Sequence, residues 1–414
     1  MNGDRVILHS DLNGFYASVE TMLDPSLRGK AVAVCGCAED RHGIILAKSE
    51  KAKAAGVKTG MVNWQALKLC PELILLPPQY DQYLKYSKLT REIYQRYTDL
   101  VEPFGMDECW LDVSESRRLF GNGREIAEKI RKSVKEELGL TVSIGVSFTK
   151  VFAKLGSDMK KPDAITEIDR ESYQEKVWNL NVGEMIYCGR STTAKLAKFG
   201  IMTIGQLAQT DPEFLKQQLG VNGVGLWRYA NGADNSRVMH KSFVSPIKSI
   251  GHGVTCVSDL LNNDEVWRVI LHLSQDVGHR LRLHELSARS VQLSVRNSEL
   301  HTAQFNVCLP YKTQLPSEIA QAAFRVFKER YSWDDKIRSL TVRATSLAPK
   351  DEPEQLSLFV DSEKLAGSER LWEAVERLRS RFGKSSLTYA ALLGNIKVPD
   401  DGRHKIKMPG IMYR

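Results

Sequence analysis

Apolar and polar residues alternate along the first half of the chain with periods that predict strands and helices in turn. Residues 5–12 are predicted to form a buried strand, and residues 80–99 and 122–138 show helical periodicity. Residues 141–148 alternate strictly, which is typical of a half-exposed strand. This order predicts an α+β sheet with its helices on one face and its other face open.

The second half contains three further segments. Residues 180–232 hold two glycine-punctuated helical hairpins, and a polar connector follows at about 233–248. Residues 249–348 again alternate as strands, with a helix near 318–330. Beyond Pro349 the chain becomes acidic and loop-like. We therefore expect several domains followed by a tail.

Acidic residues interrupt two of the strand-like apolar runs. Asp11 lies at one of them, and Asp107 and Glu108 lie together at the other. Ionised carboxylates are costly to bury unless a cation or hydrogen bonds compensate them, so the pattern predicts a divalent metal site. Oxygen ligands favour Mg²⁺ or Mn²⁺, and two such ions suit phosphoryl transfer. The alternative is that Asp107 and Glu108 solvate a hairpin turn, since acids are mostly exposed.

Composition narrows the class of protein. The 414 residues carry a formal net charge of +8, which favours polyanions such as nucleic acid as partners. No apolar run is long enough to span a membrane, and no basic, apolar leader precedes the first strand. The seven cysteines are scattered and odd in number. These features predict a cytosolic protein with reduced thiols.

Basic and glycine-rich motifs follow the strand at 141–148. Lys150 and Lys154 share a helical face, and Lys161 follows shortly after; such point charges suit a triphosphate beside a metal site. The glycine turns at 188–190 and 219–225 precede helices, whose N-termini can bind phosphate. The alternatives are a solvated lysine face and ordinary glycine helix caps.

In this order and at this spacing, the motifs resemble the Y-family translesion DNA polymerases, in the branch of bacterial DNA polymerase IV and UmuC-type proteins. The resemblance extends from about residue 5 to about residue 395. It rests on both glycine hairpins and on residues 11–20, 43–61, 83–87, 106–112 and 143–162.

The resemblance implies an α+β multidomain fold of the right-hand polymerase type. Its parts would be a ferredoxin-like palm, small fingers, a helical thumb with helix-hairpin-helix turns, and an α+β little finger. They would occupy residues 1–18 and 78–166 (palm), 19–77 (fingers), 167–232 (thumb) and 245–348 (little finger), with a linker at 233–244 and a tail at 349–414.

The resemblance also implies the site residues. Two Mg²⁺ ions, with Mn²⁺ as a possible substitute, would be held by Asp11, Asp107, Glu108 and the carbonyl of Leu12. The nucleotide would be bound by Phe15, Tyr16, Lys53 and Lys161, with Tyr16 as the steric gate against ribonucleotides. Primer–template DNA would contact Gly189, Gly223 and Gly225. A sliding clamp would bind the peptide formed by Gln355, Leu356, Leu358 and Phe359.

The sequence departs from the family pattern at three places. Glu50 replaces the usual tyrosine near the triphosphate, so only Lys53 is carried over from that pair. Gly105 replaces a serine before the acids, and Tyr187 replaces the first glycine of the first hairpin. The Tyr187 replacement puts the phosphate contact of that hairpin in doubt.

The function implied is low-fidelity, template-directed DNA synthesis from deoxynucleoside triphosphates, without proofreading, by a monomer in the bacterial cytoplasm at the nucleoid. Two alternatives are a DNA-binding accessory protein that has lost synthesis and a nucleotide cyclase, whose catalytic domain shares a palm-like sheet with paired acids.

Overall fold

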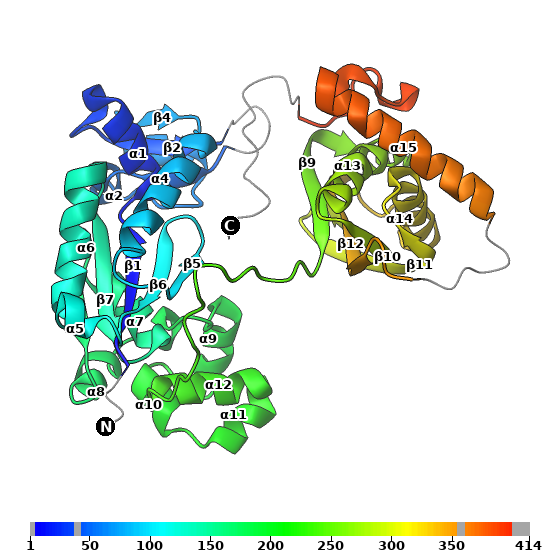
Figure 1. Cartoon of the computed structure of the whole chain (residues 1–414). Helices are drawn as coiled ribbons and strands as arrows, with labels where there is room; N and C mark the ends of the chain where they lie inside the picture. The colour runs from blue at the N-terminus through cyan, green and yellow to red at the C-terminus, as the bar shows by residue number, and fades with distance from the viewer. Residues whose placement is uncertain (1–4, 37–42, 354–360, 400–414) are drawn as a thin grey trace. The chain divides into compact units, whose positions relative to one another are not determined.

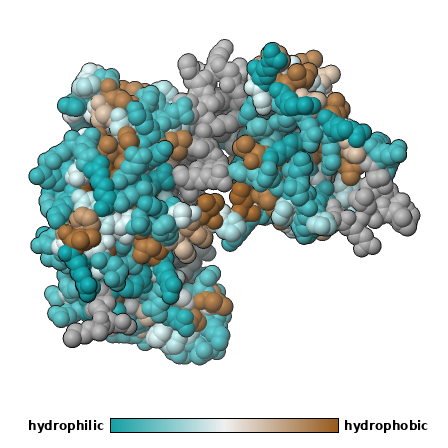
Figure 2. Space-filling model, in the orientation of Figure 1, coloured by the Kyte–Doolittle hydropathy of each residue, from teal (hydrophilic) through white to brown (hydrophobic). Residues whose placement is uncertain are grey.

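The computed structural model describes residues 5–36, 43–353 and 361–399 and divides the chain into two compact units. The first contains residues up to 36 and 44–245, and the second begins at residue 246. The face shown in Figure 2 is largely hydrophilic with scattered apolar residues. No helix in the described ranges has both the length and the apolar character needed to cross a bilayer.

A five-stranded sheet forms the centre of the first unit (Figure 1). In spatial order the strands are β5 (Val101–Phe104), β6 (Glu108–Asp112), β1 (Ile7–Leu12), β7 (Val142–Ser147) and β8 (Ile165–Ile168). Strands β7 and β8 are parallel, and all other neighbouring strands are antiparallel. The nearby helices are α1 (Phe15–Leu23), α4 (Tyr80–Tyr94), α5 (Arg117–Phe120), α6 (Gly123–Leu138) and α7 (Lys150–Met159).

Helices cover both faces of this sheet, which corrects the prediction of helices on one face. On one face, Leu8 and Ile144 pack in a core with side chains of α4 and α6. On the other, Ile7 and Trp110 pack with Ala153 of α7. Asp11 and Glu108, which alternate in register with Ile7 and Trp110, therefore share their face of the sheet with α7 instead of lying on an open surface.

Strand β7 is buried along its whole length, so the prediction of a half-exposed strand was also wrong. Its second face carries Ser143, Gly145 and Ser147, which are small enough for a close helix contact. A Cβ added at Gly145 would lie 1.9 Å from the carbonyl oxygen of Ala153 in α7. The alternation of small polar and apolar residues thus reflects close packing against a helix, not contact with water.

Smaller substructures flank the sheet. A three-stranded sheet in the order β3 (Ile45–Lys48), β2 (Val32–Cys35), β4 (Ile74–Leu76) packs with α2 (Glu50–Ala54) and α3 (Asn63–Leu69). A helical subdomain shares its core with α7 and contains α8 (Tyr173–Val177), α9 (Arg190–Ala197), α10 (Ile204–Gln209), α11 (Pro212–Leu219) and α12 (Val221–Ala230).

The segment predicted as a linker, residues 233–244, is held against the first unit. Val238 is buried beside Ile7 and Trp110. The Met239 amide donates to the Glu102 carboxylate at 2.9 Å, and Lys241 pairs with Asp99 at 2.6 Å. This segment is therefore anchored by packing and polar contacts along strands of the five-stranded sheet.

The second unit is a four-stranded antiparallel sheet covered by helices. Its strands are β11 (Thr302–Thr313), β10 (Leu286–Asn297), β12 (Ile337–Pro349) and β9 (Ile250–Leu260), in that spatial order. Apolar residues of α13 (Asn263–Leu283) and α14 (Pro316–Arg330) form one core with the inner face of the sheet.

A helix that the sequence analysis did not predict, α15 (Ser362–Phe382), lies within the expected tail. Its Trp372 is buried, and the guanidinium groups of Arg282 and Arg379 lie 5.6 and 5.4 Å from the ring centroid. The tail is therefore partly folded onto the second unit. The predicted clamp peptide, residues 355–359, lies outside the described residues.

Candidate active site

Two of the predicted acids face each other across neighbouring strands. Asp11 of β1 is the direct partner of Glu108 of β6 in the antiparallel register. Opposed side chains in such a pair have Cβ atoms about 5 Å apart. Asp107 precedes β6, and its carbonyl accepts a hydrogen bond from the Leu12 amide at 3.0 Å. The fold thus places Asp11 and Glu108 opposite each other at one end of β1, with the backbone of Asp107 adjoining them.

Two lysines, Lys154 in α7 and Lys161 shortly after that helix, neutralise two of these carboxylates. Lys161 Nζ lies 2.7 Å from Asp11 Oδ2, and Lys154 Nζ lies 3.0 Å from Glu108 Oε2 and 3.6 Å from Asp11 Oδ2. Both lysines also pair with Asp158. The sequence analysis expected these lysines beside a triphosphate and did not foresee that they bind the acids themselves.

The three carboxylates differ in how well neighbouring positive charges and hydrogen bonds offset the cost of burying their negative charge. Burial raises the pKa of Asp11, against the opposing charges of Lys161 and Lys154. Burial also opposes ionisation of Glu108, but contacts with His9 and Lys154 outweigh it and lower that pKa. Burial, followed by the charges of Asp11 and Glu108, raises the pKa of Asp107 to about 7. Asp107 is the carboxylate with the least compensation.

Within the described ranges, no three His, Cys, Asp or Glu side chains converge into a group that could hold a metal ion. Instead, the ammonium groups of Lys154 and Lys161 occupy the positions next to the carboxylates. The donor set itself fits a hard cation, because it consists of carboxylate oxygens. The pKa of Asp107 is raised first by burial and then by the charges of Asp11 and Glu108, so a bound cation would lower it.

His9 belongs to this site, although sequence reasoning missed it. Its ring is fully buried and lies edge-on to Trp110 with centroids 5.2 Å apart. His9 Nε2 is 3.3 Å from Glu108 Oε2. The signal in the sequence was the spacing of two residues to Asp11, which places both side chains on one face of a strand.

Tyr16 is held by an aromatic cluster at the start of α1. Its ring stacks on Tyr83 of α4, with centroids 4.2 Å apart and an interplanar angle of 8°. Tyr80 lies edge-on to it at 6.0 Å, and Phe15 is buried beside it. The hydroxyl of Tyr83 donates to the Glu20 carboxylate. Tyr16 is therefore supported from behind by α4.

The two other predicted nucleotide ligands have different surroundings. Lys53 is exposed and pairs with Glu50 at 3.4 Å, so each neutralises the other. The chain after Lys161 is fixed by the Asp163 amide, which donates to Asn13 Oδ1 at 2.9 Å. Arg131 adds an ion pair to Asp163 at 2.8 Å. These contacts hold the segment after Lys161 next to the end of β1.

The glycine motifs are only partly as predicted. Gly189 is exposed and precedes the first residue of α9. In the second hairpin the turn with positive φ is at Gly220, and α12 begins at Val221, five residues earlier than expected. Gly223 and Gly225 are therefore helical. A Cβ at Gly223 would lie 2.3 Å from the Leu215 carbonyl oxygen, so this glycine permits close packing of α11 on α12.

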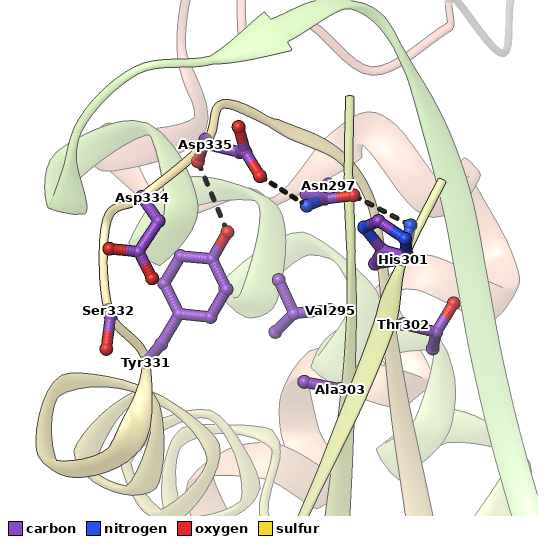
Figure 3. A pocket seen from close by; sticks show the side chains of 9 residues that line it. All are labelled: Val295, Asn297, His301, Thr302, Ala303, Tyr331, Ser332, Asp334 and Asp335. Carbon is purple, nitrogen blue, oxygen red and sulfur yellow. Dashed lines mark hydrogen bonds between the residues drawn. The ribbon is translucent and has the colours of Figure 1, made fainter. Parts of the chain in front are cut away.

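A hollow of about 180 Å³ lies in the second unit between the ends of β10 and β11 and residues 331–335 (Figure 3). Its polar groups bind one another. Asn297 Nδ2 donates to Asp335 Oδ2 at 2.6 Å, and the Tyr331 hydroxyl donates to the Asp335 carbonyl at 3.2 Å. These bonds close the loop after α14, and the hollow carries no chemistry comparable to the acid cluster.

Comparison with known proteins decides the family. Residues 10–158 match the impB/mucB/samB family, and residues 247–358 match its C-terminal domain. DNA polymerase IV of Acetivibrio thermocellus is 51% identical over 389 residues, covering 94% of this chain and 98% of that protein. DNA polymerase IV 1 of Bacillus subtilis is 36% identical, with coverages of 94% and 93%. The chain belongs to the Y family of translesion DNA polymerases, in its DNA polymerase IV branch.

A solved structure supports the fold assignment independently. A chimeric Y-family DNA polymerase superimposes with a TM-score of 0.74 at 20% identity, covering 83% of this chain and 99% of that one. At this identity the match concerns the fold alone. The right-hand polymerase fold class predicted from the sequence is confirmed.

The pKa of Asp107 leads to a testable pH dependence of stability. Without divalent cations, the folded protein keeps a proton on Asp107 up to about pH 7, whereas the unfolded chain releases it near pH 4. Stability from this group is therefore lost as the pH rises from about 4 to 7. We expect Asp107→Asn to exceed the wild type in unfolding free energy at pH 8 by more than about 1 kcal/mol.

Denaturant unfolding in metal-free buffer measures this difference, which should shrink as the pH falls towards 4. A difference between the two proteins that stays constant from pH 4 to pH 8 would contradict the electrostatic assignment of Asp107.

Proposed function

We propose that this protein is a template-directed DNA polymerase of the translesion type, which adds deoxynucleotides to a primer 3′-hydroxyl with low fidelity and without proofreading. Membership of the DNA polymerase IV branch supports this function. The observation that carries it is the pairing of Asp11 with Glu108 across β1 and β6, with Asp107 adjoining. Three carboxylates at one strand end match the needs of phosphoryl transfer.

In this proposal the acids hold two Mg²⁺ ions, which Mn²⁺ can replace, and the Leu12 carbonyl completes the ligand set. The ions supply charge that activates the primer hydroxyl and stabilises the departing pyrophosphate. Binding requires Asp11 and Glu108 to exchange their lysine partners for the ions. Lys161 is then free to contact the triphosphate, and Lys154 stays near enough to balance the remaining negative charge.

The sugar and phosphates of the incoming nucleotide would be recognised by residues around the acids. Tyr16 acts as the steric gate, because stacking on Tyr83 prevents its ring from moving aside for a 2′-hydroxyl. Phe15 supports that ring from the core. Lys53 contributes a cation near the phosphates once its pair with Glu50 is broken.

The remaining parts would bind DNA. The five-stranded sheet with Asp11 is the palm, residues 19–77 are the fingers, residues 167–232 the thumb and residues 245–348 the little finger. Gly189 precedes α9, and Gly223 and Gly225 lie in the first two turns of α12; the N-termini of these two thumb helices would face the DNA backbone. The net charge of +8 favours binding to the phosphates of primer–template DNA.

A primer-extension assay tests the function. The wild type should extend a primer with deoxynucleotides and Mg²⁺, and Asp107→Ala/Glu108→Ala should lose at least about 1,000-fold in rate, since metal charge lowers the barrier by several kcal/mol. The matched control is Glu136→Ala/Glu137→Ala, which removes two adjacent exposed acids of α6. Extension that survives in the first double variant would refute the metal assignment. DNA binding without synthesis by the wild type would favour the accessory-protein alternative.

Sugar selection tests the role of Tyr16. Tyr16→Ala should raise ribonucleotide incorporation relative to deoxynucleotide incorporation by roughly tenfold or more, because the ring that meets the 2′-hydroxyl is gone. The control is Tyr86→Ala, which removes another half-buried tyrosine from α4. Single-nucleotide insertion kinetics give the ratio. Sugar discrimination equal to that of the wild type would rule out Tyr16 as the gate.

The tail is proposed to bind a sliding clamp through Gln355, Leu356, Leu358 and Phe359. Leu358→Ala/Phe359→Ala should weaken clamp binding by at least roughly 30-fold, since the loss of even one buried apolar anchor of this kind costs about 2 kcal/mol. Synthesis without the clamp should persist. Leu378→Ala/Phe382→Ala, which removes two exposed apolar side chains of α15, is the control. Surface plasmon resonance measures the affinities, and equal affinity in all three proteins would contradict the proposal.

A further inference from the structure

His9 connects the core of the palm to one of the three carboxylates. It lies on β1 two residues before Asp11 and is fully buried. Its Nδ1 is 2.8 Å from the hydroxyl of Ser157 in α7, and its Nε2 is 3.3 Å from Glu108 Oε2. His9 thus spans the space between α7 and the end of β6, and its contacts fix where the Glu108 carboxylate can lie.

The groups next to the His9 ring determine which of its two nitrogens carries the proton. An unprotonated Nε2 would place its lone pair against the Glu108 carboxylate, so an N–H must face that carboxylate. In the neutral ring, Nδ1 is then the acceptor towards the Ser157 hydroxyl, whose single hydrogen is shared with the Lys154 carbonyl oxygen at 2.8 Å. A chain of polar contacts therefore leads from Ser157 through His9 to Glu108.

Among the described residues, Glu108 Oε2 has two nitrogen neighbours, His9 and Lys154. His9 Nε2 and Glu108 Oε2 are both buried, and neither makes a well-aligned hydrogen bond, whether to the other atom or to a further group. Within the described ranges, the only ammonium or guanidinium group within 4 Å of Glu108 Oε2 is that of Lys154, at 3.0 Å. A polar side chain left unpaired in a core is costly, so an apolar residue at position 9 would be more stable if packing alone mattered.

The two partners of Glu108 differ in how rigidly their side chains are held. Lys154 has a flexible side chain and is the partner that must be released when a cation enters. His9 is fixed by its strand, by Trp110 and by Ser157. We propose that His9 is a positioning residue, which keeps the Glu108 carboxylate oriented towards the divalent cations when the contact between Lys154 and Glu108 is broken. This inference rests on the proposed function only through the presence of those cations.

The test compares substitutions that remove or keep the Nε2 donor. His9→Leu removes it, whereas His9→Gln places an amide N–H at the same number of bonds from Cβ. Ser157→Ala removes the support behind the ring without altering His9. Ser10→Ala is the matched control, because it deletes a buried hydrogen bond, to Tyr94, from the opposite face of the same strand. Thermal unfolding identifies variants that are folded.

Electron paramagnetic resonance measures Mn²⁺ binding to the complex with a dideoxy-terminated primer–template and a deoxynucleotide, so no synthesis is required. We expect His9→Leu to weaken Mn²⁺ binding by tenfold or more, as for other residues that orient metal ligands, and Ser157→Ala to weaken it less. His9→Gln should recover most of the loss. Ser10→Ala should bind Mn²⁺ as the wild type does. The Mg²⁺ concentration for half-maximal primer extension should shift in the same order.

Wild-type Mn²⁺ affinity in His9→Leu would overturn the positioning role. So would an equal loss in His9→Leu, His9→Gln and Ser10→Ala, which would indicate general destabilisation. Failure of the proposed function gives a different result: the wild type would bind Mn²⁺ but would not extend the primer, and the comparison of Mn²⁺ affinities would still decide the role of His9.

Discussion

The five-stranded sheet of the first unit can fold only if three carboxylates at the ends of its strands are compensated by positive charge or hydrogen bonds. Asp11, Asp107 and Glu108 would strongly oppose folding if they were ionised without partners. Two lysines of the α7 segment supply the compensation at 2.7 and 3.0 Å. They can do so because Gly145 lets α7 lie directly on β7. The packing of α7 and the electrostatics of the candidate site therefore depend on each other. Asp107 is the acid whose pKa burial and the neighbouring acids raise to about 7.

Sequence patterns predicted the parts of this arrangement that depend on local order. The apolar runs around Asp11 and Glu108 predicted strands, and the family resemblance predicted the fold class. The patterns failed where tertiary packing decides the outcome. Alternation at 142–147 could not distinguish water from a helix as the neighbour of the small residues. Helix α15 was missed, although its Trp372 packs on the second unit.

The same limit applies to the candidate site. The three acids were found because charged residues in apolar runs are conspicuous. His9 was not, since a single histidine in a strand is usually a satisfied core residue, and its role depends on contacts with Ser157 and Glu108 from distant segments. The departure at Glu50 is also clearer in three dimensions. Because Lys53 pairs with it, the local change is a neutral pair rather than a repulsive acid.

Anomalous diffraction from crystals of the protein with Mn²⁺, a dideoxy-terminated primer–template and a deoxynucleotide tests the central claim most directly. The account predicts Mn²⁺ peaks about 2–2.4 Å from carboxylate oxygens of Asp11, Asp107 and Glu108, with Lys161 moved away from Asp11. Peaks elsewhere, or acids still paired with Lys154 and Lys161 beside a bound nucleotide, would contradict it.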